Sequence, residues 1–448
     1  MKRNLKNGNI VAVLVASVLI ACTQDSIDDL ARQADTSLSF TKGLSPSRTY
    51  KEALSVAQDA IKMLDEVNTT RSSKPRTVNP FDVQYIIDGS STRSADISDT
   101  LMYVFNFEDD AGFAIVSANR ATEELIAVTE QGKYVVGEDT KNEGFDMYMD
   151  MAKRYVGSTI AEINYGPDVL LDYKRETVYD TLSYGPYLEV RWGQKWPYNM
   201  YCLTPDGQQS RSGCVATALA QIMTFYEYPS SLTIDYTDSS YSQELHWDDI
   251  KLHFLSQDTI GHDCVYCALS SITPAETHKE IGKVLRQLGK LLNTNYRVGA
   301  ASAYGETVAS VLQNLGYSFG GYQAYKDSIV QRSLSTRTLV YMQGVKAEVQ
   351  EGHAWVVDGH RRITKTTTEY VRPEGNEQWE VMYESYDILN YNHINWGWDG
   401  TCNGYFSSGV YQASKGAEYD AGVGTNYANN YPTQLMIQPN IRKPLVLN

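Results

Sequence analysis

The sequence predicts an α+β fold arranged as two successive domains. The chain has 448 residues, more than a single hydrophobic core ordinarily serves. Apolar residues recur at helical spacing over Cys214–Glu227 and Thr277–Leu292, whereas short strands separated by Gly and Asn turns dominate from about Thr338 onward. We therefore expect a smaller α+β domain first, followed by a second domain with a helical half and an antiparallel β half.

Composition and charge exclude several classes of protein. Hydrophobic residues make up 42% of the chain and charged residues 21%, which is typical of a folded globular protein rather than a fibrous or disordered one. The 54 acidic and 39 basic residues give a formal net charge of -15. Such a charge repels nucleic acid and anionic lipid surfaces, so neither is an expected partner.

Residues 1–21 form a predicted signal peptide. Lys2, Arg3 and Lys6 precede an apolar run over residues 10–21 that is too short to span a bilayer as a stable helix. The run ends in Leu-Ile-Ala-Cys, which resembles a bacterial lipobox, so Cys22 is expected to be lipidated; a plain secretory signal is the alternative. The remainder is expected outside the cytoplasm, lipid-anchored to the bacterial outer membrane or cell surface, or secreted in its mature form.

The first domain is expected over residues 22–175. Apolar residues from Leu54 to Leu64 lie on one helical stripe, and residues 101–118 (LMYVFNF, EDDAG, FAIVSA) predict a β-hairpin. Residues 146–163 are again helix-like. Residues 165–187 show little periodicity and are expected to be an exposed connection to the second domain, residues 176–448.

Cys214 is the first candidate functional residue, because it stands at the start of a predicted helix. The segment SGCVATALAQIMTFYEYP has the apolar stripe of a buried helix, with Ser212 and Gly213 as cap and turn residues and Pro229 after its end. Unpaired N–H groups and the positive end of the helix dipole lower the pKa of a thiol there. Cys214 is therefore a candidate nucleophile, although an isolated cysteine is more often a small buried hydrophobe or half of a disulfide.

A nucleophilic cysteine needs a basic partner, and His353 is the best placed of the 7 histidines. It begins the strand-like run HAWVVDG in the second half of the domain. In the later segment NYNHINWGWDG, Asn395 offers an amide oxygen to orient the imidazole, and Trp396 offers an indole to shield that hydrogen bond. Asp358 is the rival orienting group, ranked lower because it lies an odd number of residues after His353 on a strand.

Two glutamines compete to stabilise an oxyanion. Gln208 lies six residues before Cys214, and the spacing favours it; Gln194 lies in the segment WGQKWPYN. Spacing alone therefore favours Gln208.

Four segments together resemble the streptopain family of papain-like bacterial cysteine proteases. They are WGQKWPYN, GCVATALAQIM, GHAWVVDG and HINWGWDG, in that order. The resemblance implies a papain-like catalytic domain with Cys214, His353, Gln194, Asn395 and Trp396 in the site, and it favours Gln194 over Gln208. It also implies a cysteine endopeptidase that needs no cofactor or metal and acts on proteins or peptides.

The resemblance extends more loosely to residues 101–134, where GFAIVSANR is similar to the propeptide of the same family. The first domain is therefore expected to be an intramolecular inhibitor, and the protein an autoprocessed zymogen. Lys174-Arg175 is the predicted cleavage point. The alternatives are a cell-wall amidase with the same Cys-His site and a catalytically inactive surface-binding lipoprotein.

Four further cysteines remain, namely Cys202, Cys264, Cys267 and Cys402, and they allow three disulfide pairings that the sequence does not distinguish. Cys264 and Cys267 lie near three histidines. No second Cys or His pair at a zinc-finger spacing follows, so a disulfide or free thiols are favoured over a zinc site.

Overall fold

The computed structural model describes residues 47–67, 75–87, 100–158, 172–235, 239–251, 272–346, 351–372, 378–411 and 433–444. The signal segment, Cys22, Cys264 and Cys267 lie outside the described residues.

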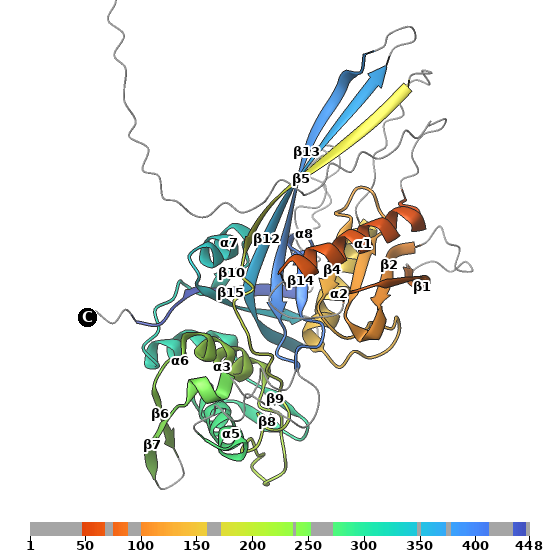
Figure 1. Cartoon of the computed structure of the whole chain (residues 1–448). Coiled ribbons are helices and arrows are strands. Elements are labelled where there is room, and N and C mark those ends of the chain that lie inside the picture. The colour runs from red at the N-terminus through yellow and green to blue at the C-terminus, as the bar shows by residue number, and fades with distance from the viewer. Residues whose placement is uncertain are drawn as a thin grey trace, which may run out of the picture.

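The N-terminal domain, residues 47–158, has a sheet with one helix on each face (Figure 1). Its elements are α1 (Tyr50–Val67), β1 (Val78–Ile87), β2 (Thr100–Phe107), β3 (Phe113–Ser117), β4 (Leu125–Thr129) and α2 (Glu143–Ser158). Strand side chains alternate between the two faces, so in β2 Met102 and Val104 pack in the core that contains α2, while Tyr103 and Phe105 pack in the core that contains α1. The predicted helix and hairpin are confirmed, and α2 begins a little before the predicted residue 146.

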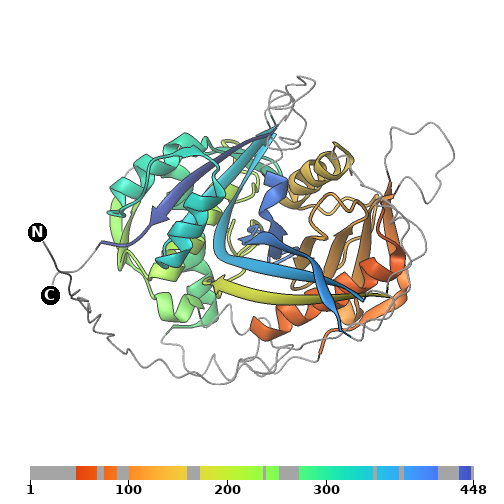
Figure 2. The same ribbon diagram turned by 90° about the horizontal axis from the view of Figure 1, so that it is seen from above.

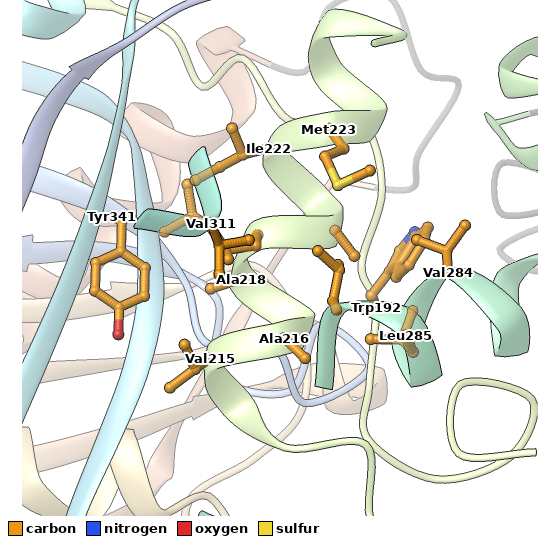
Figure 3. Packing of buried hydrophobic residues seen from close by; sticks show 14 of the residues in the cluster. Trp192, Val215, Ala216, Ala218, Ile222, Met223, Val284, Leu285, Val311 and Tyr341 are labelled. Carbon is orange, nitrogen blue, oxygen red and sulfur yellow. The ribbon is translucent and has the colours of Figure 1, made fainter. Parts of the chain in front are cut away.

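The helical half follows the strand β5 (Asp172–Tyr184) and contains Cys214. It consists of α3 (Cys214–Tyr226), β6 (Ser231–Asp235), β7 (Ser240–Glu244), α5 (Pro274–Leu291), β8 (Asn295–Arg297), β9 (Ala300–Ser302) and α6 (Val308–Asn314). Every residue of α3 from Val215 to Thr224 is buried. Figure 3 shows why: Val215 and Ile222 face Tyr341 on the sheet side, while Met223 faces the side of Trp192. Since α3 is packed on both sides, its first residue is held firmly in place.

The β half extends the sheet of the N-terminal domain. Its elements are β10 (Gln323–Ala324), α7 (Asp327–Ser335), β11 (Leu339–Lys346), β12 (Glu351–Arg372), β13 (Glu380–Asn395), β14 (Gly404–Ser407), α8 (Ser408–Tyr411) and β15 (Thr433–Ile441). The strand order β1-β2-β3-β4-β14-β13-β12-β11-β15-β10 runs through both domains, and each neighbouring pair is antiparallel. The junction is β4 against β14. Seen from above, the helical half and the N-terminal domain lie on opposite sides of β12 and β13 (Figure 2).

The segment expected to be an exposed connection is instead a strand, β5 (Asp172–Tyr184). It pairs with β12 from His360↔Tyr184 to Arg372↔Asp172, and with β12 and β13 it extends away from the body (Figure 1). The prediction was wrong because DYKRETVYDTLSY lacks a regular alternation of apolar residues, and the pairing partner lies far along the chain. The backbone at Lys174 and Arg175 is therefore part of the sheet, opposite Tyr370 and Glu369.

Candidate active site

Cys214 is the first residue of α3, and the helix start around it carries no side-chain cap. Gly213, with φ 94°, is the N-cap residue, a conformation that favours glycine. The sequence suggested Ser212 as the cap, but its Oγ lies 3.1 Å from Oγ1 of Thr217 instead. The first-turn N–H groups and the positive end of the helix dipole are thus left to the Cys214 sulfur and to a group bound there.

His353 lies near the start of β12, where its ring is buried among tryptophans. The indole of Trp398 stacks nearly parallel to the imidazole, with centroids 5.9 Å apart and an interplanar angle of 18°. Nε2 of His353 donates a hydrogen bond to the carbonyl oxygen of Trp396 at 2.8 Å. The orientation of the ring is therefore fixed by stacking and by a backbone acceptor.

Cys214 and His353 are brought together and shift each other's pKa. Burial opposes ionisation of the Cys214 thiol, but the His353 charge and the backbone N–H of Ala354 outweigh it and lower the thiol pKa. Burial likewise opposes a charged His353, but the Cys214 thiolate, Glu143 and the Trp396 carbonyl raise the pKa of His353 to about 10. Each partner thus favours the charged form of the other, and the thiolate–imidazolium form is the one required for nucleophilic attack.

Asn395 does not make the hydrogen bond that the sequence suggested. Its Oδ1 accepts from the N–H of Gly397 at 3.1 Å, and its Nδ2 donates to the carbonyl of Val190 at 2.9 Å. The amide thus stabilises the turn after β13. The hydrogen bond of His353 that was expected to go to the Asn395 oxygen goes to the backbone carbonyl of Trp396. The rival Asp358 is also engaged elsewhere, because its Oδ1 lies 2.6 Å from Nδ1 of His393.

Gln194 lies beside the start of α3, since its carbonyl accepts from the N–H of Ser212 at 3.1 Å. The side chain is buried, and its Nε2 has no hydrogen-bond partner within the described residues. A buried amide N–H without an acceptor is costly unless something else fills that role. Gln208, by contrast, is exposed.

Sequence reasoning missed Glu143 and Arg211 at this site. Glu143 opens α2 of the N-terminal domain, and its Oε2 lies 3.7 Å from Nδ1 of His353. Its Oε1 lies 3.1 Å from Nη1 of Arg211, whose guanidinium covers the ring of Trp398 at 4.8 Å. No local sequence signal points to these contacts, because Glu143 belongs to a separate domain far from Cys214 and His353 along the chain.

Because residue 144 is a glycine, α2 packs closer to the imidazole than a residue with a side chain would allow. A Cβ atom at this position would lie 2.5 Å from Cδ2 of His353 and 2.5 Å from Cε3 of Trp396. Both neighbours are buried rings and cannot move aside easily. The N-terminal domain therefore covers the imidazole directly.

The other described cysteines are free, buried thiols. Burial raises the pKa of Cys202 to about 11 and that of Cys402 to about 12. Both thiols are therefore protonated at neutral pH, and no disulfide joins these two residues.

None of the helices in the described ranges combines the length and the apolar character needed to cross a membrane.

Two family models match the chain, one in each domain. Residues 192–406 match the model of the Peptidase C10 family, and residues 44–156 match that of the Spi protease inhibitor. The first match spans Gln194, Cys214, His353, Asn395 and Trp396; the second spans Glu143 and Gly144.

Two curated relatives and one solved structure are similar to this chain. Streptopain of Streptococcus pyogenes is 26% identical over 349 residues, covering 69% of this chain and 74% of streptopain. The thiol protease/hemagglutinin PrtT of Porphyromonas gingivalis is 25% identical over 342 residues, 70% of this chain but 34% of PrtT. A prointerpain A fragment from Prevotella intermedia aligns with a TM-score of 0.46 and 20% identity, covering 80% of this chain and 98% of the fragment.

The protein is thus a cysteine endopeptidase that carries an inhibitor-type prodomain. Its protease part is a streptopain-like domain of the Peptidase C10 family, and its prodomain is of the Spi type.

Proposed function

We propose that Cys214 is the nucleophile of this endopeptidase and His353 its proton-transfer partner. The thiolate adds to the carbonyl carbon of a peptide bond, and the oxyanion accepts hydrogen bonds from Nε2 of Gln194 and the N–H of Cys214. His353 gives its proton to the leaving amine, which leaves a thioester on Cys214. Water then loses a proton to His353 and hydrolyses the thioester, releasing the acid product and restoring the thiolate. No step requires a metal or cofactor.

The observation that carries this proposal is the Cys214–His353 pair at an uncapped helix start. The pKa of Cys214 is lowered although desolvation of the thiol opposes its ionisation, which requires a specific positive partner. The unpartnered Nε2 of Gln194 supports its role as the second oxyanion donor. Trp396 supplies the carbonyl that orients the imidazolium, and Asn395 holds the turn that presents this carbonyl.

We further propose that the protein is a zymogen that matures itself, with residues 22–175 as propeptide and 176–448 as protease. Glu143 and Gly144 contact His353 in the intact chain, so a substrate cannot approach the imidazole while α2 is in place. The Lys174-Arg175 site lies within β5, so cleavage there requires this end of the strand to separate from β12.

We also propose that Cys22 is lipidated and that the precursor is anchored outside the cytoplasm. The lipobox-like Leu-Ile-Ala-Cys segment supports this assignment. Mass spectrometry of the membrane fraction should show a diacylglycerol-modified N-terminus, and Cys22→Ser should release the precursor into the soluble fraction. A precursor that stays unmodified yet is exported would favour the plain secretory signal.

The test of the catalytic assignment is the Cys214→Ala precursor. It should fold, remain at full length and fail to hydrolyse casein, whereas Cys202→Ala, which removes a buried thiol outside the pair, should mature and hydrolyse casein. Mass spectrometry after treatment with a thiol alkylator should find the label on Cys214. Maturation and casein hydrolysis by Cys214→Ala would show that another nucleophile operates.

A further inference from the structure

Arg211 is a cation placed next to the proposed catalytic pair without a role in the proposed chemistry. It lies three residues before Cys214, and its guanidinium covers Trp398, the ring that also stacks on His353. Within the described ranges its acidic partner is Glu143, whose two carboxylate oxygens reach Arg211 at 3.1 Å and His353 at 3.7 Å. One carboxylate therefore spans the distance between the guanidinium and the imidazole.

That carboxylate belongs to the prodomain and leaves when the prodomain is removed. Arg211 stays with the protease domain, where it is already partly exposed in the precursor. The stacking on Trp398 holds the planar guanidinium in position, and such a group binds a carboxylate strongly. Once the prodomain is removed, Arg211 has lost Glu143 and can bind the carboxylate of another molecule beside the imidazole.

The side of the substrate that reaches this site follows from the proposed mechanism. His353 protonates the leaving amine, so the residues after the scissile bond pass next to the imidazole. Glu143 lies next to Nδ1 of His353, and Gly144 packs against Cδ2 of the same ring. The prodomain segment therefore occupies the space that the leaving-group side of a substrate would occupy.

We propose that, in the mature enzyme, Arg211 is a specificity residue that binds a carboxylate on the leaving-group side of the substrate, and that Glu143 fills this subsite in the precursor. This inference rests on the proposed roles of Cys214 and His353. The carboxylate can come from an Asp or Glu side chain or from the C-terminus of a short peptide, and both present the same two oxygens to the guanidinium.

The test is the ratio of kcat/KM for paired fluorogenic peptides cleaved by the mature enzyme. Each pair carries Glu or Gln at one position, with a matching Lys peptide for the charge-reversal variant, and the position is scanned over two residues on either side of the scissile bond. All peptides are amidated, and a second set with free C-termini reports binding of a terminal carboxylate. Because the ratio is taken within one preparation, it does not depend on how much of a variant has folded.

The wild-type enzyme should prefer Glu by about five- to tenfold at a leaving-group position, mainly through KM, as expected of a charge-assisted contact at a partly exposed site. Arg211→Gln should bring the ratio to near one, Arg211→Lys should retain part of it, and Arg211→Glu should favour Lys over Glu. If peptides with a free C-terminus are preferred over amidated ones but Glu is not preferred over Gln, the site binds the C-terminal carboxylate of a peptide.

Equal cleavage of Glu and Gln peptides by the wild-type enzyme in both sets, or a preference that survives Arg211→Gln, would overturn the inference. Neither result would affect the catalytic assignment. A wild-type enzyme that is labelled at no cysteine by an alkylator and cleaves none of the peptides would instead refute the proposed function, and this inference with it.

Discussion

Oε1 of Glu130 lies 3.4 Å from Nε2 of His393 and so joins the prodomain to the protease domain through an ion pair. The other ring nitrogen of His393 lies 2.6 Å from Oδ1 of Asp358, and Arg191 approaches Glu130 at 3.3 Å. Asp358 and His393 are buried. The prodomain thus places a carboxylate against each of two buried histidines, Glu130 against His393 and Glu143 against His353.

The Glu130–His393 pair predicts a bell-shaped dependence of precursor stability on pH. Burial opposes the charge on Glu130, but His393, Arg191 and Arg76 lower its pKa from 4.5 to about 2. The contribution of Glu130 is therefore complete above pH 4.5 and is lost as the pH falls towards 2. Burial also opposes the charge on His393, but Asp358 and Glu130 raise its pKa from 6.5 to about 10. The contribution of His393 is complete below pH 6.5 and is lost as the pH rises towards 10.

Denaturant unfolding of the Cys214→Ala precursor should therefore show a stability plateau between about pH 4.5 and 6.5. Glu130→Gln should lower the free energy of unfolding by about 3 kcal/mol on that plateau, because it removes one partner of a buried ion pair. Glu138→Gln, at an exposed glutamate of the same domain, is the matched control and should have little effect. An unchanged pH profile in Glu130→Gln would show that the pair does not couple the domains.

A second prediction concerns the close contact at Gly144. Gly144→Ala would place a Cβ 2.5 Å from the buried rings of His353 and Trp396, so α2 must move away from the imidazole. The cost of such overpacking is about 1–3 kcal/mol. Active enzyme should therefore develop from the full-length precursor about tenfold faster than in the wild type, as measured by cleavage of a short fluorogenic peptide over time.

Gly157→Ala is the control for this experiment. Gly157 lies in the last turn of α2, and a Cβ there would meet Leu101 Cδ2 at 3.7 Å, an ordinary van der Waals contact. Alanine should support the helix without moving it, and activation should be as slow as in the wild type. Equal activation rates in the two variants would mean that the contact with His353 does not maintain latency.

A third prediction tests the charge state of Cys214. Because the imidazolium of His353 lowers the pKa of the thiol, the mature enzyme should react with iodoacetamide well below pH 9.0, the ordinary pKa of a cysteine. In His353→Ala the midpoint of this reaction should move to higher pH, because the imidazolium makes the largest of the contributions that lower the thiol pKa. Cys202, whose pKa is raised to about 11, serves as the internal control and should stay unlabelled at neutral pH.

Features carried by local patterns were predictable from the sequence. Helix α3 follows from its apolar residues, and Cys214 at its first position follows from the turn-forming Gly213 before it. His353 at the start of β12 follows from a strand pattern after a Gly turn. Cys214 and His353 come together because α3 packs against β11 and β12 through buried apolar side chains.

Features that depend on partners far along the chain were not predictable. The strand β5 has a polar sequence and forms only because β12 offers an edge. The oxygen that accepts from His353 belongs to the backbone of Trp396, which has no side-chain signature, whereas the amide oxygen of the neighbouring Asn395 accepts from Gly397. Glu130 and Glu143 are ordinary surface-type residues until the two domains pack together.

The last prediction separates the two glutamines that the sequence left in competition. Gln194→Ala removes a buried N–H donor near Cys214, so kcat should fall by about 10²–10³ with little change in KM, as expected for a group that binds only the oxyanion. Gln208→Ala is the matched control, because Gln208 is exposed, and both constants should stay at wild-type values. Steady-state kinetics of the two mature variants on one peptide decides the question. A large loss of kcat in Gln208→Ala with a normal Gln194→Ala would reverse the assignment, and it would require the loop before α3 to move after the prodomain leaves.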